Sequence, residues 1–234
     1  MTFEQWLQSR LTAHGYPVGP VGGAFGAKSR AALIDFQRGN NIDPSGLADA
    51  ATVAALRTNP RGETRPVAPA PVERMPPWMA EMYRRKGLHE TRDNGALSSW
   101  LRIGRFLGNP AKLPWCGDAV ETAIVKTLPA EPVPDNPFWA QGWARFGVAA
   151  GASDVGAIGV IRWSARAGHV GIVAAHDARR RRVLLLGGNQ SDAITLSWFP
   201  LSKFIAFRWP STFPRKVYPA LDAKGNSGSL AATR

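Results

Sequence analysis

Apolar residues in the first sixty positions recur at helical spacing. The first apolar stripe contains Phe3, Trp6, Leu7 and Leu11. It ends at Gly15-Tyr16-Pro17, and a glycine-rich loop over 19–26 follows. A second helix is expected from Ser29, and a short third helix is expected over 52–56. The pattern predicts a three-helix domain over residues 1–58.

The following segment has no apolar period. Residues 59–76 hold several prolines among small and charged residues, which is typical of a semi-rigid linker. The other end of the chain, residues 215–234, is rich in Gly, Ala and Ser and is expected to be a disordered tail. These two segments leave residues 77–214 as a second, larger domain.

Helical and strand patterns follow one another in this larger domain. Helical spacing is expected over 78–86 and 97–106, and a third helix begins at Cys116. Short apolar runs then predict successive strands at 156–163, 168–175, 183–187, 194–198 and 204–209. Strands joined by short connections favour an antiparallel sheet. We therefore predict an α+β domain in which this sheet packs on helices.

Charge and composition narrow the classes of function only slightly. The formal net charge is +12, and almost all of the excess lies after residue 60, where 24 Lys and Arg face 13 Asp and Glu. Such a surface attracts polyanions, including anionic envelope polymers, but no nucleic-acid motif accompanies it. No apolar window reaches the roughly 20 residues of a membrane span. We expect a soluble chain, made in the cytoplasm without a signal peptide, and a monomer.

The chain contains one cysteine, so no intramolecular disulfide can form. Cys116 follows Leu113-Pro114-Trp115 and starts the apolar stripe of a helix, where the positive end of the helix dipole favours a thiolate. A buried cysteine can also be a simple packing residue. With four His and no HExxH or CxxC spacing, we expect neither a metal nor another cofactor.

A candidate base and its partner lie on two neighbouring predicted strands. A hairpin centred near Arg179 places His169 opposite Asn189, within an uncertainty of one residue in register. The Asn189 carboxamide could then hold one imidazole nitrogen and leave the other facing the thiol. Nucleophile, base and orienting residue would therefore meet in the order Cys, His, Asn, as in papain-like enzymes.

The N-terminal module resembles a known family, the three-helix peptidoglycan-binding domain. The resemblance is carried by Leu7-Gln8, Leu11, Gly15-Tyr16, Gly22-Gly23-Ala24-Phe25-Gly26, Ser29, Ala32, Phe36-Gln37, Asp43, Gly46, Thr52 and Leu56. It implies that peptidoglycan is a partner. Tyr16 and Phe25 are the candidate contacts.

The larger domain resembles the CHAP family of cysteine, histidine-dependent amidohydrolases and peptidases. Its motifs are Leu113-Pro114-Trp115-Cys116-Gly117-Asp118, Gly168-His169-Val170-Gly171-Ile172-Val173 and Leu186-Gly187-Gly188-Asn189-Gln190-Ser191-Asp192. The resemblance implies a papain-like fold and a peptidoglycan hydrolase that acts through Cys116, His169 and Asn189. Trp115, Gly168 and Gln190 are expected to touch substrate. The two-domain order is similar to that of bacteriophage endolysins, which implies action on the wall after release through a membrane hole or as part of a virion.

Several alternatives stay open on sequence alone. An N-acetylmuramoyl-L-alanine amidase and an endopeptidase both cut amide bonds, and subsite shape separates them. A noncatalytic wall-binding or phage-particle structural protein is the second hypothesis, and a basic nucleic-acid binder is the third. Aromatic residues could line a substrate cleft or belong to the core. The aromatic candidates are Trp139, Trp143, Phe146 and Trp163.

Overall fold

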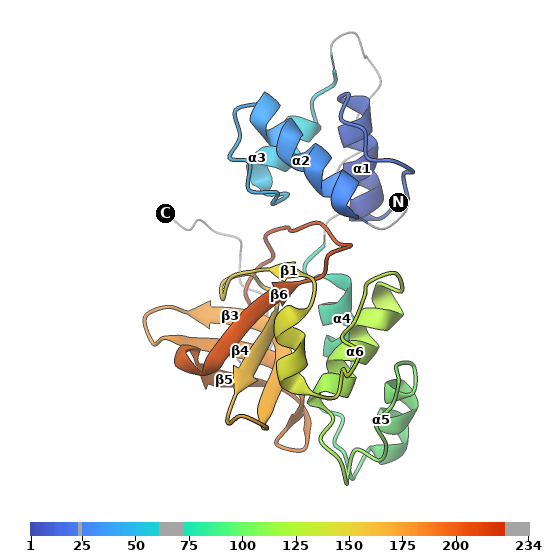
Figure 1. The fold of residues 1–234 in the computed structure, drawn as a ribbon, viewed down its shortest axis with the longest axis vertical. Helices are drawn as coiled ribbons and strands as arrows, with labels where there is room; N and C mark the ends of the chain where they lie inside the picture. The colour runs from blue at the N-terminus through green and yellow to red at the C-terminus, as the bar shows by residue number, and fades with distance from the viewer. Residues whose placement is uncertain (23–24, 61–72, 223–234) are drawn as a thin grey trace. The chain divides into compact units, whose positions relative to one another are not determined.

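A computed structural model describes residues 1–22, 25–60 and 73–222 and divides the chain into two compact units (Figure 1). The first unit consists of Met1–Glu73 with Ser211–Val217, and the second consists of Arg74–Pro210 with the residues from Tyr218 onward. The predicted linker falls largely on residues 61–72, and the end of the predicted tail is 223–234. Both segments lie outside the described residues.

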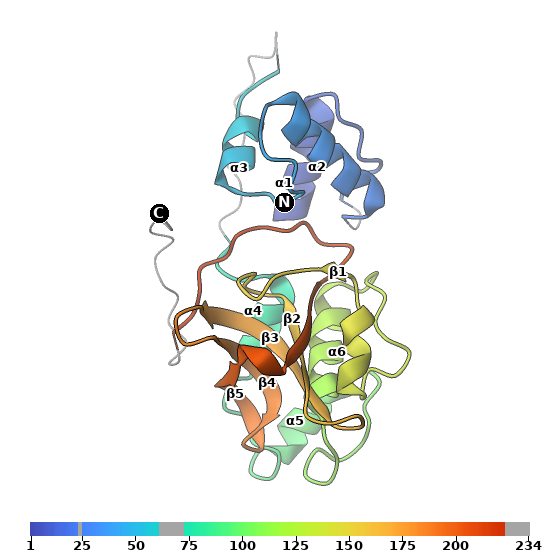
Figure 2. The same ribbon diagram turned by 60° about the vertical axis from the view of Figure 1, so that its left-hand side comes forward.

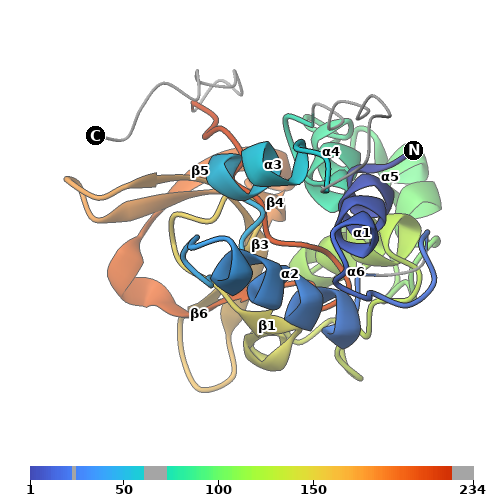
Figure 3. The same cartoon turned by 90° about the horizontal axis from the view of Figure 1, so that it is seen from above.

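The described residues of the first unit form three α-helices, as the apolar pattern predicts (Figure 3). They are α1 (Phe3–Ala13), α2 (Ala27–Gly39) and α3 (Ala50–Leu56). Thr2 and Gln5 form a reciprocal capping box at the start of α1, and the Asp49 carboxylate accepts a hydrogen bond from the Thr52 amide at the start of α3. These caps satisfy amide groups that have no partner within the helix.

The apolar stripes of these helices meet in one core. Its largest buried members are Phe3, Trp6, Leu7, Leu11, Phe25, Leu33, Phe36 and Leu56. Inside it, the Gln37 side chain donates to the Leu47 carbonyl at 2.8 Å and accepts from the Gly46 amide at 2.9 Å. Because Gln37 satisfies both groups, the turn before α3 is fixed to α2.

A short C-terminal segment, Ser211–Val217, belongs to the first unit. The Phe25 amide donates to the Thr212 carbonyl at 2.6 Å, and the Ala48 amide donates to the Arg215 carbonyl at 2.5 Å. Backbone hydrogen bonds thus attach this segment to both loops between the helices.

The prediction of a tail from residue 215 is wrong for 215–222, which make defined contacts. Beyond Val217, the Tyr218 ring stacks on Trp209 at 6.4 Å, and the Leu221 amide donates to the Ala174 carbonyl at 2.9 Å. Tyr218 and Leu221 are also buried. The burial of these two apolar side chains stabilises the observed path of this stretch.

The second unit is an α+β domain, as predicted, with one antiparallel sheet (Figure 2). Its strands are β1 (Val148–Ala149), β2 (Ile158–Arg162), β3 (Gly168–Asp177), β4 (Arg182–Gln190), β5 (Ala193–Pro200) and β6 (Phe204–Trp209). They are arranged in the order β1-β6-β2-β3-β4-β5, and every pair is antiparallel. The β3–β4 hairpin turns at 178–181, which confirms its predicted centre near Arg179.

Helices pack on this sheet and on each other. They are α4 (Pro77–Tyr83), α5 (Asn94–Leu101) and α6 (Cys116–Thr127), with the 3-10 helices η1 (Ala140–Arg145) and η2 (Leu201–Lys203). Helix α6 contacts β3 and β4, α4 contacts α6 and β4, and η1 packs against β2, β3 and β6. The start of α6 therefore lies against the two strands that carry His169 and Asn189.

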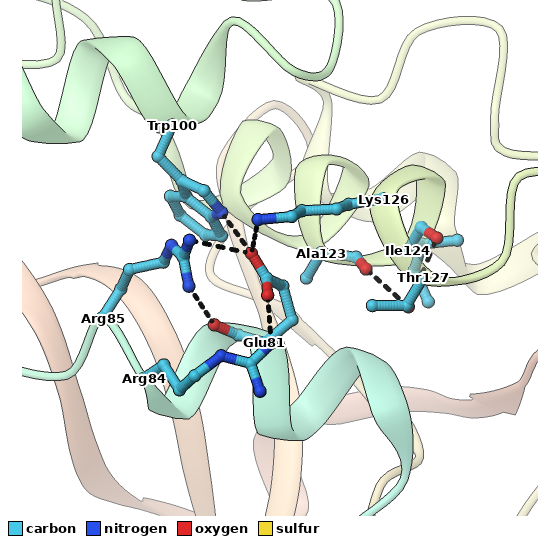
Figure 4. A network of polar contacts seen from close by, with 8 residues as sticks. All are labelled: Glu81, Arg84, Arg85, Trp100, Ala123, Ile124, Lys126 and Thr127. Carbon is cyan, nitrogen blue, oxygen red and sulfur yellow. Dashed lines mark hydrogen bonds and ion pairs between the residues drawn. The ribbon is translucent and has the colours of Figure 1, made fainter.

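A buried carboxylate ties the three helices together (Figure 4). Glu81 on α4 is 1 % exposed and pairs with Arg84, with Arg85 at 3.1 Å and with Lys126 of α6 at 2.7 Å. It also accepts from the Trp100 indole of α5 at 3.1 Å. Burial raises the pKa of Glu81, but hydrogen bonds led by Lys126 and Arg84 outweigh it and the pKa falls below its usual value. Glu81 is therefore an ionised link that holds α6 in place.

None of the helices within the described residues is both long and apolar enough to span a bilayer.

Candidate functional site

Cys116 is the first residue of α6 and lies against β3. The backbone N–H groups of Val170, Gly117 and Cys116 lie near its sulfur and favour the ionised form. Val170 follows His169 in β3, so the sulfur lies beside the backbone next to His169. Among the described residues, no hydrogen bond joins the Cys116 sulfur to His169 directly.

The expected thiolate is not what the structure favours. Cys116 is only 6 % exposed, and this burial raises the pKa of its thiol despite the three N–H donors. The helix terminus was the only effect visible in the sequence, and desolvation outweighs it. The resting group is a neutral thiol.

His169 is buried beside an amide. Its Nε2 atom lies 3.0 Å from Gln190 Oε1, and its ring lies 5.4 Å from the Phe199 ring. Burial lowers the pKa of His169, and the hydrogen bond to Gln190 offsets part of this effect. The imidazole is consequently neutral at neutral pH.

The surroundings of Gln190 decide which imidazole nitrogen carries the proton. The Gln190 Nε2 group donates to the carbonyl oxygens of Thr195 at 2.7 Å and Leu185 at 3.3 Å. A carbonyl can only accept, so the amide nitrogen faces these two groups and the amide oxygen faces His169. Nε2 of His169 must then donate its proton to Gln190, and Nδ1 keeps its lone pair. Nδ1 is the atom able to take a proton.

Gln190, rather than the predicted Asn189, is the partner of His169. The pairs of β3 with β4 end at Ile172↔Leu186. Beyond this point, the pairing of β4 with β5 shifts register between Gly187 and Gln190. Asn189 itself has a φ of +55°, which turns the strand at this point. The hairpin argument was correct to within its one-residue uncertainty, but the irregularity moves the hydrogen-bonding role from residue 189 to 190.

A cavity of about 310 Å³ opens beside this pair. It is lined by Trp163, His169, Asn189, Gln190, Ser191, Ser197 and Phe199. Trp163 is 46 % exposed and its ring lies 6.1 Å from that of Phe199. Asn189 thus lines the space that His169 faces, although it does not hold the imidazole.

Other predicted contact residues fall into two groups. Trp115 is 1 % exposed, and its indole N–H donates to Glu90 Oε2 at 2.9 Å, while Phe25 is fully buried in the helical core. Their burial leaves no surface for a ligand, so the structure does not support contact with substrate. Tyr16 is half-buried with its ring edge-on to Phe36 at 5.5 Å and keeps an accessible part.

Close packing explains three glycines of the sequence motifs. A Cβ atom at Gly188 would overlap the Trp115 ring and Ala119 of α6, and a Cβ atom at Gly117 would overlap the Pro137 carbonyl oxygen. At Gly168 it would meet the Ile161 carbonyl oxygen. Gly168 therefore serves backbone packing beside His169, Gly117 lets the start of α6 approach Pro137, and Gly188 lets α6 approach the sheet.

The aromatic candidates also divide. Trp143 and Phe146 are buried in the core, whereas Trp139 is 50 % exposed and lines a second cavity of about 1030 Å³. Trp163 lines the smaller cavity beside His169. Only two of the four aromatic side chains are therefore placed to meet a ligand.

Sequence reasoning did not single out Asp118. This side chain is 1 % exposed, accepts from the Leu107 amide at 3.0 Å through Oδ2, and leaves Oδ1 without a partner. Burial, together with the nearby Glu121 carboxylate, raises the pKa of Asp118 to about 6. It lies two residues after Cys116, in a helix whose residues from Cys116 to Ile124 are all buried.

No metal-binding cluster of three or more His, Cys, Asp or Glu residues occurs in the ranges 1–22, 25–60 and 73–222.

Comparison with known proteins identifies the N-terminal module. Residues 5–56 match the peptidoglycan binding domain family, a range that includes all three helices of the first unit except the first two residues of α1. No curated protein and no solved structure matches the chain. Residues 5–56 are a peptidoglycan-binding domain, which supports association of this protein with the cell wall.

Proposed function

We propose that the protein is a peptidoglycan hydrolase in which Cys116 attacks an amide carbonyl of the cell wall. One observation carries the proposal. His169 is held through Nε2 by a fixed amide, and the backbone N–H of its neighbour Val170 lies near the Cys116 sulfur. This arrangement supports the roles of nucleophile for Cys116 on α6, base for His169 on β3 and orienting residue for Gln190 on β4. The peptidoglycan-binding domain supplies the substrate class.

The neutral resting state sets the order of proton transfers. His169 Nδ1 takes the thiol proton as the sulfur bonds to the amide carbon, so no separated charge exists before attack. The carbonyl oxygen becomes an oxyanion, for which the N–H groups of Cys116 and Gly117 are the candidate donors. The imidazolium then protonates the leaving nitrogen as the C–N bond breaks.

Water completes the cycle. The neutral imidazole removes a proton from water, which attacks the thioester carbon, and the C–S bond breaks as the sulfur recovers a proton from the imidazolium. The products are a carboxylate and an amine. This sequence uses the three side chains Cys116, His169 and Gln190 and no metal ion.

The products of digestion test the reaction class. Purified peptidoglycan treated with the full-length protein should gain free amines, detected by amine labelling, without gaining reducing sugar ends. Mass spectrometry of the soluble fragments then distinguishes an amidase, which separates glycan from peptide, from an endopeptidase, which cuts within the peptide. New reducing ends would instead indicate glycosidic cleavage and would refute the proposal.

A wall-binding protein without catalytic activity is the second candidate. It is favoured by the burial of Cys116 and by the lack of a direct thiol–imidazole hydrogen bond within the described residues. Under this alternative, the protein sediments with peptidoglycan but releases neither amines nor reducing ends. Endolysin-like release during lysis and a place in a virion are further parts of the proposal, which depend on catalysis being present.

A further inference from the structure

The larger cavity of the second unit has the chemistry of a second substrate subsite. Its volume is about 1030 Å³, and its lining includes Asp135, Trp139, Gln141, Arg145, Arg162 and Ile205. Trp139 is 50 % exposed and Ile205 is 37 % exposed, so an apolar surface is available beside the charged groups. A ligand for this space must therefore combine apolar and charged parts.

Two guanidinium groups in this cavity are available to an anion. Arg145 and Arg162 are both exposed, and neither forms an ion pair with any residue that the structure describes. Arg162 is oriented by the hydrogen bond from its Nε to Gln141 Oε1 at 2.9 Å, which leaves its terminal nitrogens free for bidentate contact with a carboxylate.

The same cavity disfavours a polyanion. The exposed carboxylate of Asp135 lies in its lining and repels a chain of closely spaced phosphates. A peptide that carries an isolated carboxylate can place that group on the arginines and keep an uncharged or cationic group beside Asp135. The lining thus favours a peptide over an anionic polymer.

Gln141, which lines this cavity, also contacts the turn that leads to His169. Arg162 lines the larger cavity, while the next residue, Trp163, lines the smaller one. In the turn between β2 and β3, the carbonyl oxygens of Ser164 and Ala167 accept hydrogen bonds from Gln141 Nε2 at 2.9 and 3.1 Å. One side chain therefore fixes both Arg162 and the turn that leads to His169.

We infer that this cavity binds the free carboxylate of a peptidoglycan stem peptide. This inference rests on the proposed function for its reaction, and on the charge and shape of the cavity for its ligand. It assigns specificity to Arg145 and Arg162, and it predicts that amidation of the substrate carboxylate weakens recognition.

The test compares two double variants that remove the same charge. Arg145→Ala/Arg162→Ala changes the cavity, and Arg179→Ala/Lys203→Ala removes two exposed cations elsewhere in the same unit. Each is made in the Cys116→Ala background, and calorimetry measures binding of a soluble stem-peptide muropeptide and of its carboxamide. The cavity variant should bind the carboxylate form about 10-fold more weakly than the control does, and the carboxamide equally.

Equal affinities of the two variants for the carboxylate form would overturn the inference. So would a cavity variant that loses affinity for polyphosphate but not for the muropeptide, because the arginines would then form a polyanion site. Binding in the Cys116→Ala background is independent of turnover. Failure of the subsite is therefore distinguishable from failure of the hydrolase proposal, which the digestion of peptidoglycan by the wild type tests separately.

Discussion

The Nε2 atom of His169 lies 3.0 Å from Oε1 of Gln190, and both side chains are more than nine-tenths buried. Because the amide nitrogen of Gln190 already donates to two carbonyl groups, this contact fixes the tautomer of the imidazole. The proton acceptor, Nδ1, is thereby defined by residues on β4 and β5. The fixed tautomer of His169 leads to specific predictions for catalysis by variants of Gln190 and for its pH dependence.

Loss of the Gln190 amide should impair catalysis more than loss of the Asn189 side chain. Gln190→Ala releases the ring and lets either nitrogen carry the proton, so kcat should fall by at least about 10-fold, within the contribution expected of a positioned base. The matched variant is Asn189→Gly, which removes the neighbouring side chain at a φ of +55° without adding strain. It should keep kcat within about threefold.

The kcat of each variant is measured from the rate of amine release from peptidoglycan. The opposite ranking, with Asn189→Gly inactive and Gln190→Ala active, would restore the role that hairpin geometry alone assigns to Asn189. Thermal unfolding of each variant separates a loss of folding from a loss of the base.

The pH dependence of kcat/KM should show a base that is neutral at rest. Activity requires unprotonated His169, whose pKa is lowered below the usual 6.5, so kcat/KM should rise with pH and reach its plateau by about pH 7. Because the pKa of the Cys116 thiol is raised, the resting site holds no thiolate–imidazolium pair. The deprotonation of such a pair therefore causes no fall of kcat/KM at alkaline pH. The hydrogen bond to Gln190 raises the pKa of His169, so the removal of Gln190 should lower this pKa further. The acid limb of the profile should then move to still lower pH.

A pH series of initial rates at saturating and limiting substrate checks this expectation. A decline of kcat/KM between pH 7 and 9 would mean that the active form is an ion pair. That result would contradict the protonation states derived from burial.

Asp118 should make the folded state less stable as pH rises. Its pKa is about 6 in the folded chain against 3.8 for an ordinary carboxyl, so the folded state holds a proton that the unfolded state has lost between these values. The free energy of unfolding should therefore fall as pH rises from about 4 to about 6 and stay level above it. Since Asp118→Asn removes the buried charge, it should flatten this dependence and add as much as about 3 kcal/mol at pH 7.

Urea unfolding, followed by tryptophan fluorescence at several pH values, measures the effect. Asp135→Asn, which alters an exposed carboxylate, is the control and should leave the pH dependence intact. A parallel pH dependence for wild type and Asp118→Asn would rule out Asp118 as its source.

Gly188 should tolerate no side chain. A methyl group there would overlap Trp115 and Ala119, so Gly188→Ala should lower the free energy of unfolding by about 1–3 kcal/mol. Gly95→Ala is the matched control, because a Cβ at Gly95 meets no atom within 4 Å. Denaturant midpoints of the two variants make the comparison, and an equal change in both would show that α6 does not rest on Gly188.

The sequence was most informative where a local pattern determines the structure. The apolar stripe of Phe3, Trp6, Leu7 and Leu11 predicts α1, and the hairpin turn near Arg179 predicts the pairing that brings His169 to within one residue of its partner. The first prediction depends on the period of a helix and the second on the pairing of two strands joined by a short turn, and residues close in sequence determine both features.

Features that depend on distant contacts could not be predicted in this way. The positive φ of Asn189 and the register shift before Gln190 occur next to Gly188, which packs closely against Trp115 and Ala119 from a distant part of the chain. The raised pKa of Cys116 follows from burial, which the dipole argument does not include. Likewise, nothing in the composition of 215–222 shows that Tyr218 stacks on Trp209.

The central claim is that Cys116 is the nucleophile that cleaves peptidoglycan, and the most direct measurement compares the wild type with Cys116→Ala. Both proteins are incubated with purified peptidoglycan, and the soluble fragments are quantified by mass spectrometry. We expect fragments from the wild type and none above background from Cys116→Ala, with both proteins bound equally to the sacculi. Equal release by the two proteins would remove Cys116 from the mechanism, and absence of release from both would leave a wall-binding protein without hydrolase activity.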